Sequence, residues 1–138
     1  MQPWHWAMLA LLPFMGDSHR LRTWAALMGA SVAPHLLPVM SVEWYVVIDA
    51  VAGTLVLRRP TGCAQRAIGA LFALMVVYSV GYMLADNPAG ASVYLDAHTI
   101  TGWAQWGCLA GWGLYNGGKA LYDRGRAARR LLASGESV

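Results

Sequence analysis

Charged residues are scarce in this sequence. Of its 138 residues, 12% are Asp, Glu, Lys or Arg and 57% are hydrophobic, whereas a soluble domain usually carries about 25% charged residues. The apolar residues fall in long blocks, which is typical of membrane proteins. The net charge of +3 does not indicate nucleic-acid binding, because the basic residues lie where helices should end and not in a groove with interleaved aromatic residues. We therefore expect an integral membrane protein, surrounded by the lipid bilayer and without a nucleic-acid partner.

Cysteine patterns and catalytic motifs are also lacking. The two cysteines, Cys63 and Cys108, show no C-x-x-C or metal-ligand spacing, so the sequence supports neither a disulfide framework nor a zinc site. No Walker loop, H-E-x-x-H, G-x-S-x-G or dinucleotide glycine pattern occurs. We expect no soluble domain that could hold an active site, and hence no enzyme, metal or cofactor.

Four hydrophobic blocks predict transmembrane helices, at about residues 23–40, 44–57, 67–85 and 98–116. The block at 67–85 contains no charge and is the clearest of the four. The first block contains Pro34 and Pro38, which predict a kink in its second half. The predicted fold is thus all-α, a polytopic transmembrane helical bundle with one domain over residues 1–118.

An apolar segment at residues 3–15, PWHWAMLALLPFM, precedes these blocks. As a helix it would cover roughly 20 Å, against about 30 Å of hydrocarbon. It has no basic n-region and no small-residue cleavage site, so a cleaved signal peptide is not expected. Two alternatives stay open: a short helix at the membrane interface, or a fifth span.

The distribution of Lys and Arg predicts the topology. With four spans from residue 23 onward, all ten basic residues fall on one side, and the opposite loops hold Glu43, Asp86 and Asp96 without a basic residue. Excess Lys and Arg mark the cytoplasmic side, so we expect a multi-pass inner-membrane protein with both termini in the cytoplasm. The basic residues on that side are Arg20, Arg22, Arg58, Arg59, Arg66, Lys119, Arg124, Arg126, Arg129 and Arg130.

The last twenty positions, residues 119–138, are predicted to form a basic cytoplasmic tail that begins as a helical extension of the fourth span. Two interpretations of its basic residues stay open. They either bind anionic headgroups, at roughly 1 kcal/mol for each residue near the surface, or only anchor the topology.

Asp49 is the most informative residue, because it lies inside the second predicted span. A carboxylate there costs about 2.5–3.5 kcal/mol on insertion scales, so it should face the bundle interior and find a partner. His35 and Asp49 are each seven residues from the turn near Val42, which places both about 10 Å below the outer end. The expected pair is therefore His35 with Asp49, as a proton relay, a pore lining or a purely structural hydrogen bond. His98 is expected at the outer end of the fourth span, about two turns away in depth, which argues against a haem held by two histidines.

Small residues recur at four-residue spacing in three of the predicted spans. Such spacing allows the close approach by which helices associate in lipid, either within one chain or between copies. The predicted packing residues are Gly29, Ala33, Gly53, Gly107, Gly111, Gly113 and Gly117.

The basic tail from Lys119 to Arg130, the glycine stripe from Gly107 to Gly117 and the intramembrane Asp49 give the chain an architecture that resembles phage holins and other small phage-encoded inner-membrane proteins. Holins as a class oligomerise in the cytoplasmic membrane and open lesions. The resemblance implies a self-associating pore or lesion former in which Asp49 and His35 line or gate a wet path. Two alternatives stay open: a non-catalytic accessory subunit of a larger membrane complex, and a small transporter or proton-conducting unit.

Overall fold

The computed structural model describes residues 3–36, 41–85 and 90–134, and every regular element within them is helical. A short helix α1, Pro3–Ala10, and a single 3-10 turn η1, Leu12–Phe14, are followed by four longer helices. These are α2 (Ser18–Leu36), α3 (Val42–Leu57), α4 (Cys63–Ala85) and α5 (Ala91–Ser134). The predicted all-α class is therefore confirmed.

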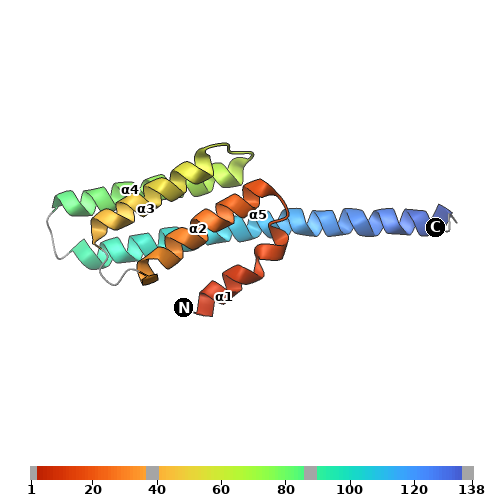
Figure 1. The fold of residues 1–138 in the computed structure, drawn as a ribbon, viewed down its shortest axis with the longest axis horizontal. Helices are drawn as coiled ribbons and strands as arrows, with labels where there is room; N and C mark the ends of the chain where they lie inside the picture. The colour runs from red at the N-terminus through yellow and green to blue at the C-terminus, as the bar shows by residue number, and fades with distance from the viewer. Residues whose placement is uncertain (1–2, 37–40, 86–89, 135–138) are drawn as a thin grey trace.

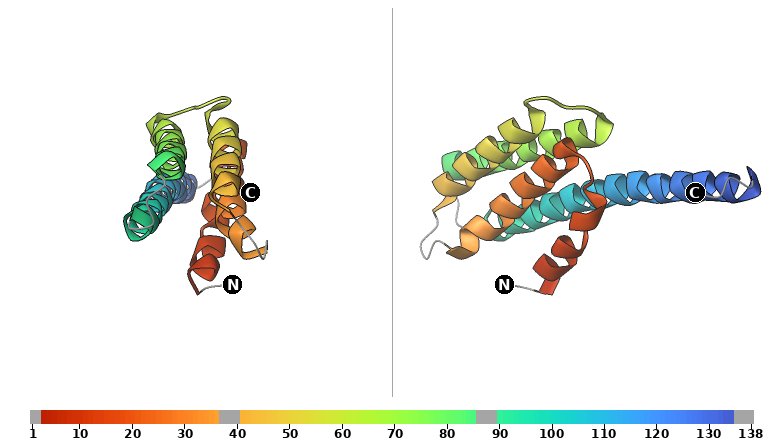
Figure 2. Two further views of the ribbon diagram at one scale, coloured as in Figure 1. Left: turned by 90° about the vertical axis from the view of Figure 1, so that its left-hand side faces the viewer. Right: turned by 45° about the vertical axis from the view of Figure 1, so that its right-hand side comes forward.

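The helices α2, α3, α4 and the first half of α5 form an antiparallel four-helix bundle (Figure 1). Viewed end-on in Figure 2, they occupy four corners, with α3 diagonal to α5. Packing is extensive between α3 and α4, between α4 and α5 and between α2 and α3, but slight between α2 and α5. Helix α1 lies beneath this α2–α5 side, and the second half of α5 runs on alone beyond the bundle (Figures 1 and 2).

Three of the four predicted blocks need their boundaries corrected. Helix α2 begins at Ser18, before the predicted start at 23, and it continues through Pro34; Pro38 lies outside the described residues. Helix α5 begins at Ala91 and ends at Ser134, so it includes both the predicted span at 98–116 and most of the predicted tail. Helix α3 differs from its predicted block by only two residues, and α4 starts four residues before the block at 67–85.

Within the described residues, α4 is the one helix long and apolar enough to cross a membrane by length and composition. Helix α3 has 16 residues, while α2 and α5 carry charged residues along part of their length. This measure does not support the predicted bundle of four spans.

The interior of the bundle contains both apolar and polar side chains. Its apolar core is centred on Leu27, Val56, Ile68, Phe72 and Leu109. Six polar side chains are buried with this core: Thr23, Asp49, Gln65, Ser79, Thr101 and Gln105.

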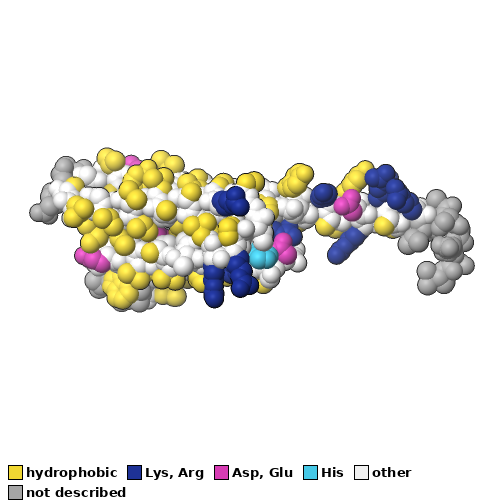
Figure 3. Space-filling model, turned by 90° about the horizontal axis from the view of Figure 1, so that it is seen from above, with side chains coloured by type: hydrophobic (Ala, Val, Ile, Leu, Met, Phe, Trp, Pro, Cys, Tyr) yellow, Lys and Arg dark blue, Asp and Glu magenta, His cyan; other side chains and the backbone are white. Residues whose placement is uncertain are grey.

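The outward faces of the helices, in contrast, are apolar. On α3 the large exposed residues recur every three or four positions, which makes one stripe along the helix: Trp44, Val47, Val51 and Leu55. Hydrophobic side chains cover much of the bundle surface in Figure 3. Monomeric soluble proteins rarely expose contiguous apolar surface of this kind.

The N-terminal segment packs back on the bundle as two short pieces. Pro13 lies in the 3-10 turn that follows α1, the indole Nε1 of Trp24 donates to the carbonyl of Met8 at 2.9 Å, and the Met8 and Met15 side chains are buried. An eight-residue helix such as α1 covers only about 12 Å. This length favours the interfacial helix over a fifth span.

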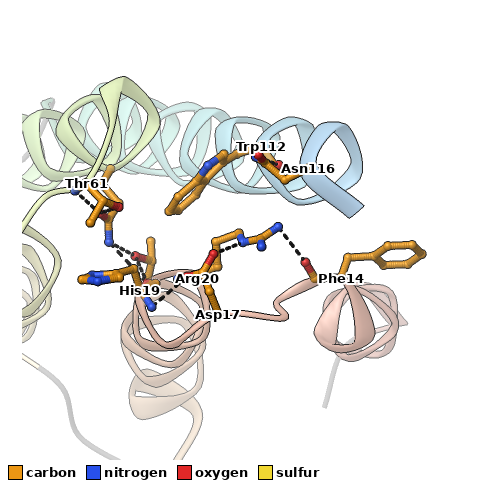
Figure 4. A network of polar contacts seen from close by, with 9 residues as sticks. Phe14, Asp17, His19, Arg20, Thr61, Trp112 and Asn116 are labelled. Carbon is orange, nitrogen blue, oxygen red and sulfur yellow. Dashed lines mark hydrogen bonds and ion pairs between the residues drawn. The ribbon is translucent and has the colours of Figure 1, made fainter. Parts of the chain in front are cut away.

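A polar network closes the bundle at the end where α2 begins and α3 passes to α4 (Figure 4). The amide Nε2 of the fully buried Gln65 donates to Thr23 Oγ1 at 2.9 Å, and its Oε1 accepts from the backbone N of Thr61 at 2.7 Å. Next to it, the Asp17 carboxylate accepts from the backbone N–H groups of His19 and Arg20, which is the geometry of a helix N-cap. These bonds tie α2 to the loop between α3 and α4.

Candidate functional site

The buried Asp49 carboxylate forms a hydrogen bond across the diagonal of the bundle. Its Oδ2 lies 3.2 Å from Nε2 of His98 on α5, and Asp49 is 3% exposed. Asp49 is the eighth residue of α3 and His98 the eighth residue of α5. Because both helices start at the same end of the bundle, the two side chains reach equal depth, about 10 Å below that end.

His35 was the predicted partner of Asp49, and the structure shows His98 as a partner that the sequence analysis did not anticipate. His98 was missed because the fourth helix was predicted to start at residue 98, which placed this histidine at its outer end. Helix α5 in fact begins seven residues earlier, at Ala91, so His98 lies two turns inside the bundle. His35 lies in the wall of the same cavity as Asp49 and His98.

Aromatic rings surround His98. The Tyr45 ring meets the imidazole edge-on, with ring centroids 5.4 Å apart, and the Tyr94 ring lies at 5.8 Å. Tyr94 is itself fixed, because its ring stacks on Tyr82 at 4.8 Å and its hydroxyl lies 3.1 Å from Ser79 Oγ. These contacts from α3, α4 and α5 orient the imidazole toward Asp49.

A cavity of about 390 Å³ adjoins the Asp49–His98 pair. It lies where α2 and α5 pack least closely, and Met8 of α1 lines one side. Most of its wall is apolar or aromatic, while its polar lining consists of Ser31, His35, Tyr45, Asp49, His98, Thr99 and Gln105. Ligand sites typically have volumes of about 300–1,000 Å³ and combine an apolar wall with a few placed polar groups.

Gln105 has a buried donor without a partner. Its side chain lines the cavity, the residue is 2% exposed, and its amide Nε2 makes no hydrogen bond. The neighbouring Thr101 hydroxyl donates instead to the carbonyl of Ala97 on its own helix, at 2.7 Å. An unsatisfied buried donor costs about 1–3 kcal/mol, so Gln105 marks a place where an acceptor would be stabilised.

An apolar layer separates this cavity from the basic end of the bundle. Val56 lies two turns beyond Asp49 on α3, and it is fully buried together with Ile68 and Leu109. The Gln65 network follows at the far end. The polar site is thus on one side of this layer.

The predicted packing residues fall into two groups. A Cβ added at Gly53 would lie 3.0 Å from Cβ of Phe72, and Cβ atoms at Gly113 and Gly117 would lie 2.5 Å from Met15 Cε and 2.9 Å from Phe14 Cδ1. Gly29, Gly107 and Gly111 have nothing within 4 Å of an added Cβ, and Ala33 is half-buried. The stripe on α5 therefore serves intrachain packing on one face and is open on the other.

Of the ten predicted basic residues, Arg20 and Arg22 are half-buried and the other eight are exposed. Lys and Arg side chains gather where α5 leaves the bundle and along its extension (Figure 3). Those at the end of α3 and the start of α4 are Arg58, Arg59 and Arg66, and those on the extension are Lys119, Arg124, Arg126, Arg129 and Arg130. No group of three or more His, Cys, Asp and Glu side chains suited to a metal ion occurs in the part of the chain that the structure describes.

The sequence analysis did not identify His98, Gln65 and Gln105 as polar residues of the bundle interior. The signal for the two glutamines was present, because an amide inside an otherwise apolar helix needs a hydrogen-bond partner just as a carboxylate does. Comparison of the chain with protein-family models, with curated proteins and with solved structures gave no match.

Proposed function

We propose that this protein is a multi-pass membrane protein in which α2, α3, α4 and the first half of α5 cross the bilayer, and that it acts as a small transporter or proton-conducting unit. Three features support the membrane location: the apolar outer faces, the buried polar groups and the gathering of basic side chains at one end. Helix α3 covers only about 24 Å, and a bilayer thins locally around short spans at a modest cost.

The observation that carries the transport proposal is the Asp49–His98 pair in the wall of a cavity. Ionisable residues inside membrane bundles are costly and mark ion and proton pathways. Histidine serves as a proton shuttle in many proteins. The apolar layer below the cavity gives the pair access from one side, and the loosely packed α2–α5 side is where the bundle could open to change that access.

Proton flux into proteoliposomes tests this function. We expect a potassium diffusion potential, set by valinomycin, to drive an internal pH change that Asp49→Asn reduces to the level of empty vesicles. Asn keeps the shape and an acceptor for His98 but cannot take up or release the proton. The matched control is Asp96→Asn, an exposed carboxylate on α5, which should leave flux unchanged. Equal flux in Asp49→Asn and in the unaltered protein would contradict the proposal.

A second candidate, the holin-like lesion former, is favoured by the open face of α5. Gly107 and Gly111 leave space beside the exposed Ile100 and Trp103, which suits close contact with a second copy. The intrachain bond of Asp49 weighs against its lining an oligomeric pore. Toxic expression with loss of membrane potential, together with a native mass of several copies, would favour this function, whereas a stoichiometric foreign partner on the same face would favour an accessory subunit.

A further inference from the structure

We infer that the cavity between α2 and α5 binds a small organic cation of the substituted-ammonium class that carries a hydrogen-bond-accepting oxygen. The inference rests on the proposed function in one respect, because it names the substrate class of the same site. It is carried by two groups in the cavity wall, the Asp49 carboxylate and the unpartnered amide of Gln105.

We infer that the ligand is positively charged because the Asp49 carboxylate lies in the cavity wall. It is the one carboxylate among the described residues that line the cavity, and its bond from His98 leaves further acceptor capacity, since a carboxylate offers about four lone-pair sites. Tyr45, Trp103 and Trp106 also line the cavity, and aromatic faces attract cations. A ligand cation is thus favoured over an anion.

We infer that the ammonium group carries alkyl substituents because the rest of the cavity wall is apolar. Met8, Leu27, Phe72 and Met75 offer no acceptor to replace the water around a strongly hydrated ion. A metal ion or a bare ammonium group would therefore lose more hydration than it regains. A methylated ammonium group carries the same charge with an apolar surface, which suits this wall and the aromatic rings.

We infer that the ligand carries a hydrogen-bond-accepting oxygen because the amide donor of Gln105 has no acceptor. Gln105 lines the cavity, and its Nε2 is buried without an acceptor. A hydroxyl or carbonyl oxygen on the cation would supply one once the amide turns toward the ligand. Water or a neutral carbonyl compound could also accept this bond, so the charge and the oxygen have to be tested separately.

Three probes of similar shape separate these contributions in equilibrium dialysis of the detergent-purified protein. Choline has the charge and the oxygen, ethyltrimethylammonium has only the charge, and 3,3-dimethylbutan-1-ol has only the oxygen. We expect choline to bind most tightly, with ethyltrimethylammonium weaker by about fivefold, the loss of one hydrogen bond. The neutral alcohol should bind weaker than choline by at least about tenfold, because it makes no charge-assisted contact.

Variants of Asp49 and Gln105 test whether these two residues bind the charge and the oxygen of the ligand. Asp49→Asn should weaken choline by at least about tenfold and leave the neutral alcohol unchanged, while Asp96→Asn changes neither. Gln105→Leu should weaken choline by about fivefold and ethyltrimethylammonium by less than about twofold. The same variant should raise the thermal midpoint of the empty protein, because it removes an unsatisfied donor, so a binding loss cannot be attributed to misfolding.

The outcomes separate this inference from the proposed function. Absence of choline binding, or tighter binding of the neutral alcohol, overturns the inference even if Asp49-dependent proton flux is intact. Choline binding that Asp49→Asn and Gln105→Leu leave unchanged also overturns it, since the ligand then lies elsewhere. Choline binding with the expected variant pattern but without flux upholds the site and contradicts transport.

Discussion

At the scale of single residues, the central feature is the carboxylate of Asp49. A carboxylate on a helix that is surrounded by lipid or by an apolar core needs a polar partner. Asp49 obtains that partner from a helix far along the chain, across the bundle diagonal. Buried ion pairs contribute little net stability against apolar replacements, but breaking one is costly. The pair therefore fixes how α3 and α5 align more than it adds to stability.

This asymmetry predicts the behaviour of a double mutant. His98→Leu alone leaves the carboxylate buried without its partner and should lower the free energy of unfolding by about 3 kcal/mol. The addition of Asp49→Leu should restore most of that loss, because an apolar pair replaces the polar one. Chemical unfolding in detergent measures both, with Asp96→Leu as the exposed control. A double mutant as unstable as the sum of its single mutants would show that the two side chains do not interact.

Asp17 predicts a pH dependence outside the spanning segments. Burial raises the pKa of its carboxyl, but hydrogen bonds from Arg20, the charge of Arg20 and a bond from the His19 backbone outweigh burial and leave the pKa below its ordinary value of 3.8. A lowered folded-state pKa contributes stability that is present above the unfolded value and is lost as pH falls through the folded value. Asp17→Asn, which keeps a capping oxygen, should thus be less stable than the unaltered protein above about pH 4.

Below that pH the stability difference between Asp17→Asn and the unaltered protein should shrink, because both then carry an uncharged side chain at this position. Thermal midpoints measured in detergent between acid and neutral pH test the sign. A difference that grows toward acid pH would contradict the assigned role of Asp17.

The sequence analysis identified the charged residue in the bundle interior but did not identify the uncharged polar residues there. Asp49 was identifiable because a carboxylate in an apolar block always needs an explanation. The bond from His98 was not, because the depth of His98 depends on where α5 starts, and that start was predicted seven residues too late. Gln65 and Gln105 carry no charge, so their need for partners was overlooked although it has the same physical origin.

At the scale of helices, the glycines of α5 fall on two different faces of the helix. Gly113 and Gly117 accept the side chains of η1, whereas Gly107 and Gly111 face open space. Gly113→Leu should displace η1 and cost about 1–3 kcal/mol, as overpacking does. Gly111→Leu is its matched control and should change the stability of a monomer by less than about 0.5 kcal/mol.

Thermal unfolding and native mass in detergent compare the two glycine variants. Equal destabilisation by both would show that η1 does not pack on α5 as described. A fall in native mass for Gly111→Leu alone would show that the open face joins copies of the chain, which is the property required of the holin-like candidate.

Helix positions were largely predictable and helix ends were not. Blocks of apolar residues located α3 and α4 within a few residues because burial in lipid or protein depends on composition. Helix α5 was predicted to continue past its span at 98–116 into the tail, and it does so through Gly117 and Gly118, but it begins seven residues earlier than predicted. Helix continuation depends on backbone hydrogen bonds, and a single glycine costs only about 1 kcal/mol.

At the scale of the whole molecule, the proposed function requires that the two ends of the bundle lie on opposite sides of the bilayer. The basic residues and the Gln65 network lie at one end of the bundle, and the Asp49–His98 cavity lies toward the other. If lipid surrounds the apolar faces, the two ends must lie on opposite sides of the membrane. The extension of α5 then lies on the side of the basic residues, and the Asp49–His98 cavity lies nearer the opposite side.

Thiol labelling in bacterial spheroplasts tests most directly whether the two ends of the bundle lie on opposite sides of the membrane. Cys63 is exposed at the basic end, and Ser92 is exposed near the start of α5 at the other end. In a Cys108→Ala background, a membrane-impermeant maleimide should reach Cys63 only after the membrane is permeabilised. In a Cys63→Ala, Cys108→Ala, Ser92→Cys protein it should label intact spheroplasts. Labelling of both positions from the same side would contradict a membrane-crossing bundle and the transport function built on it.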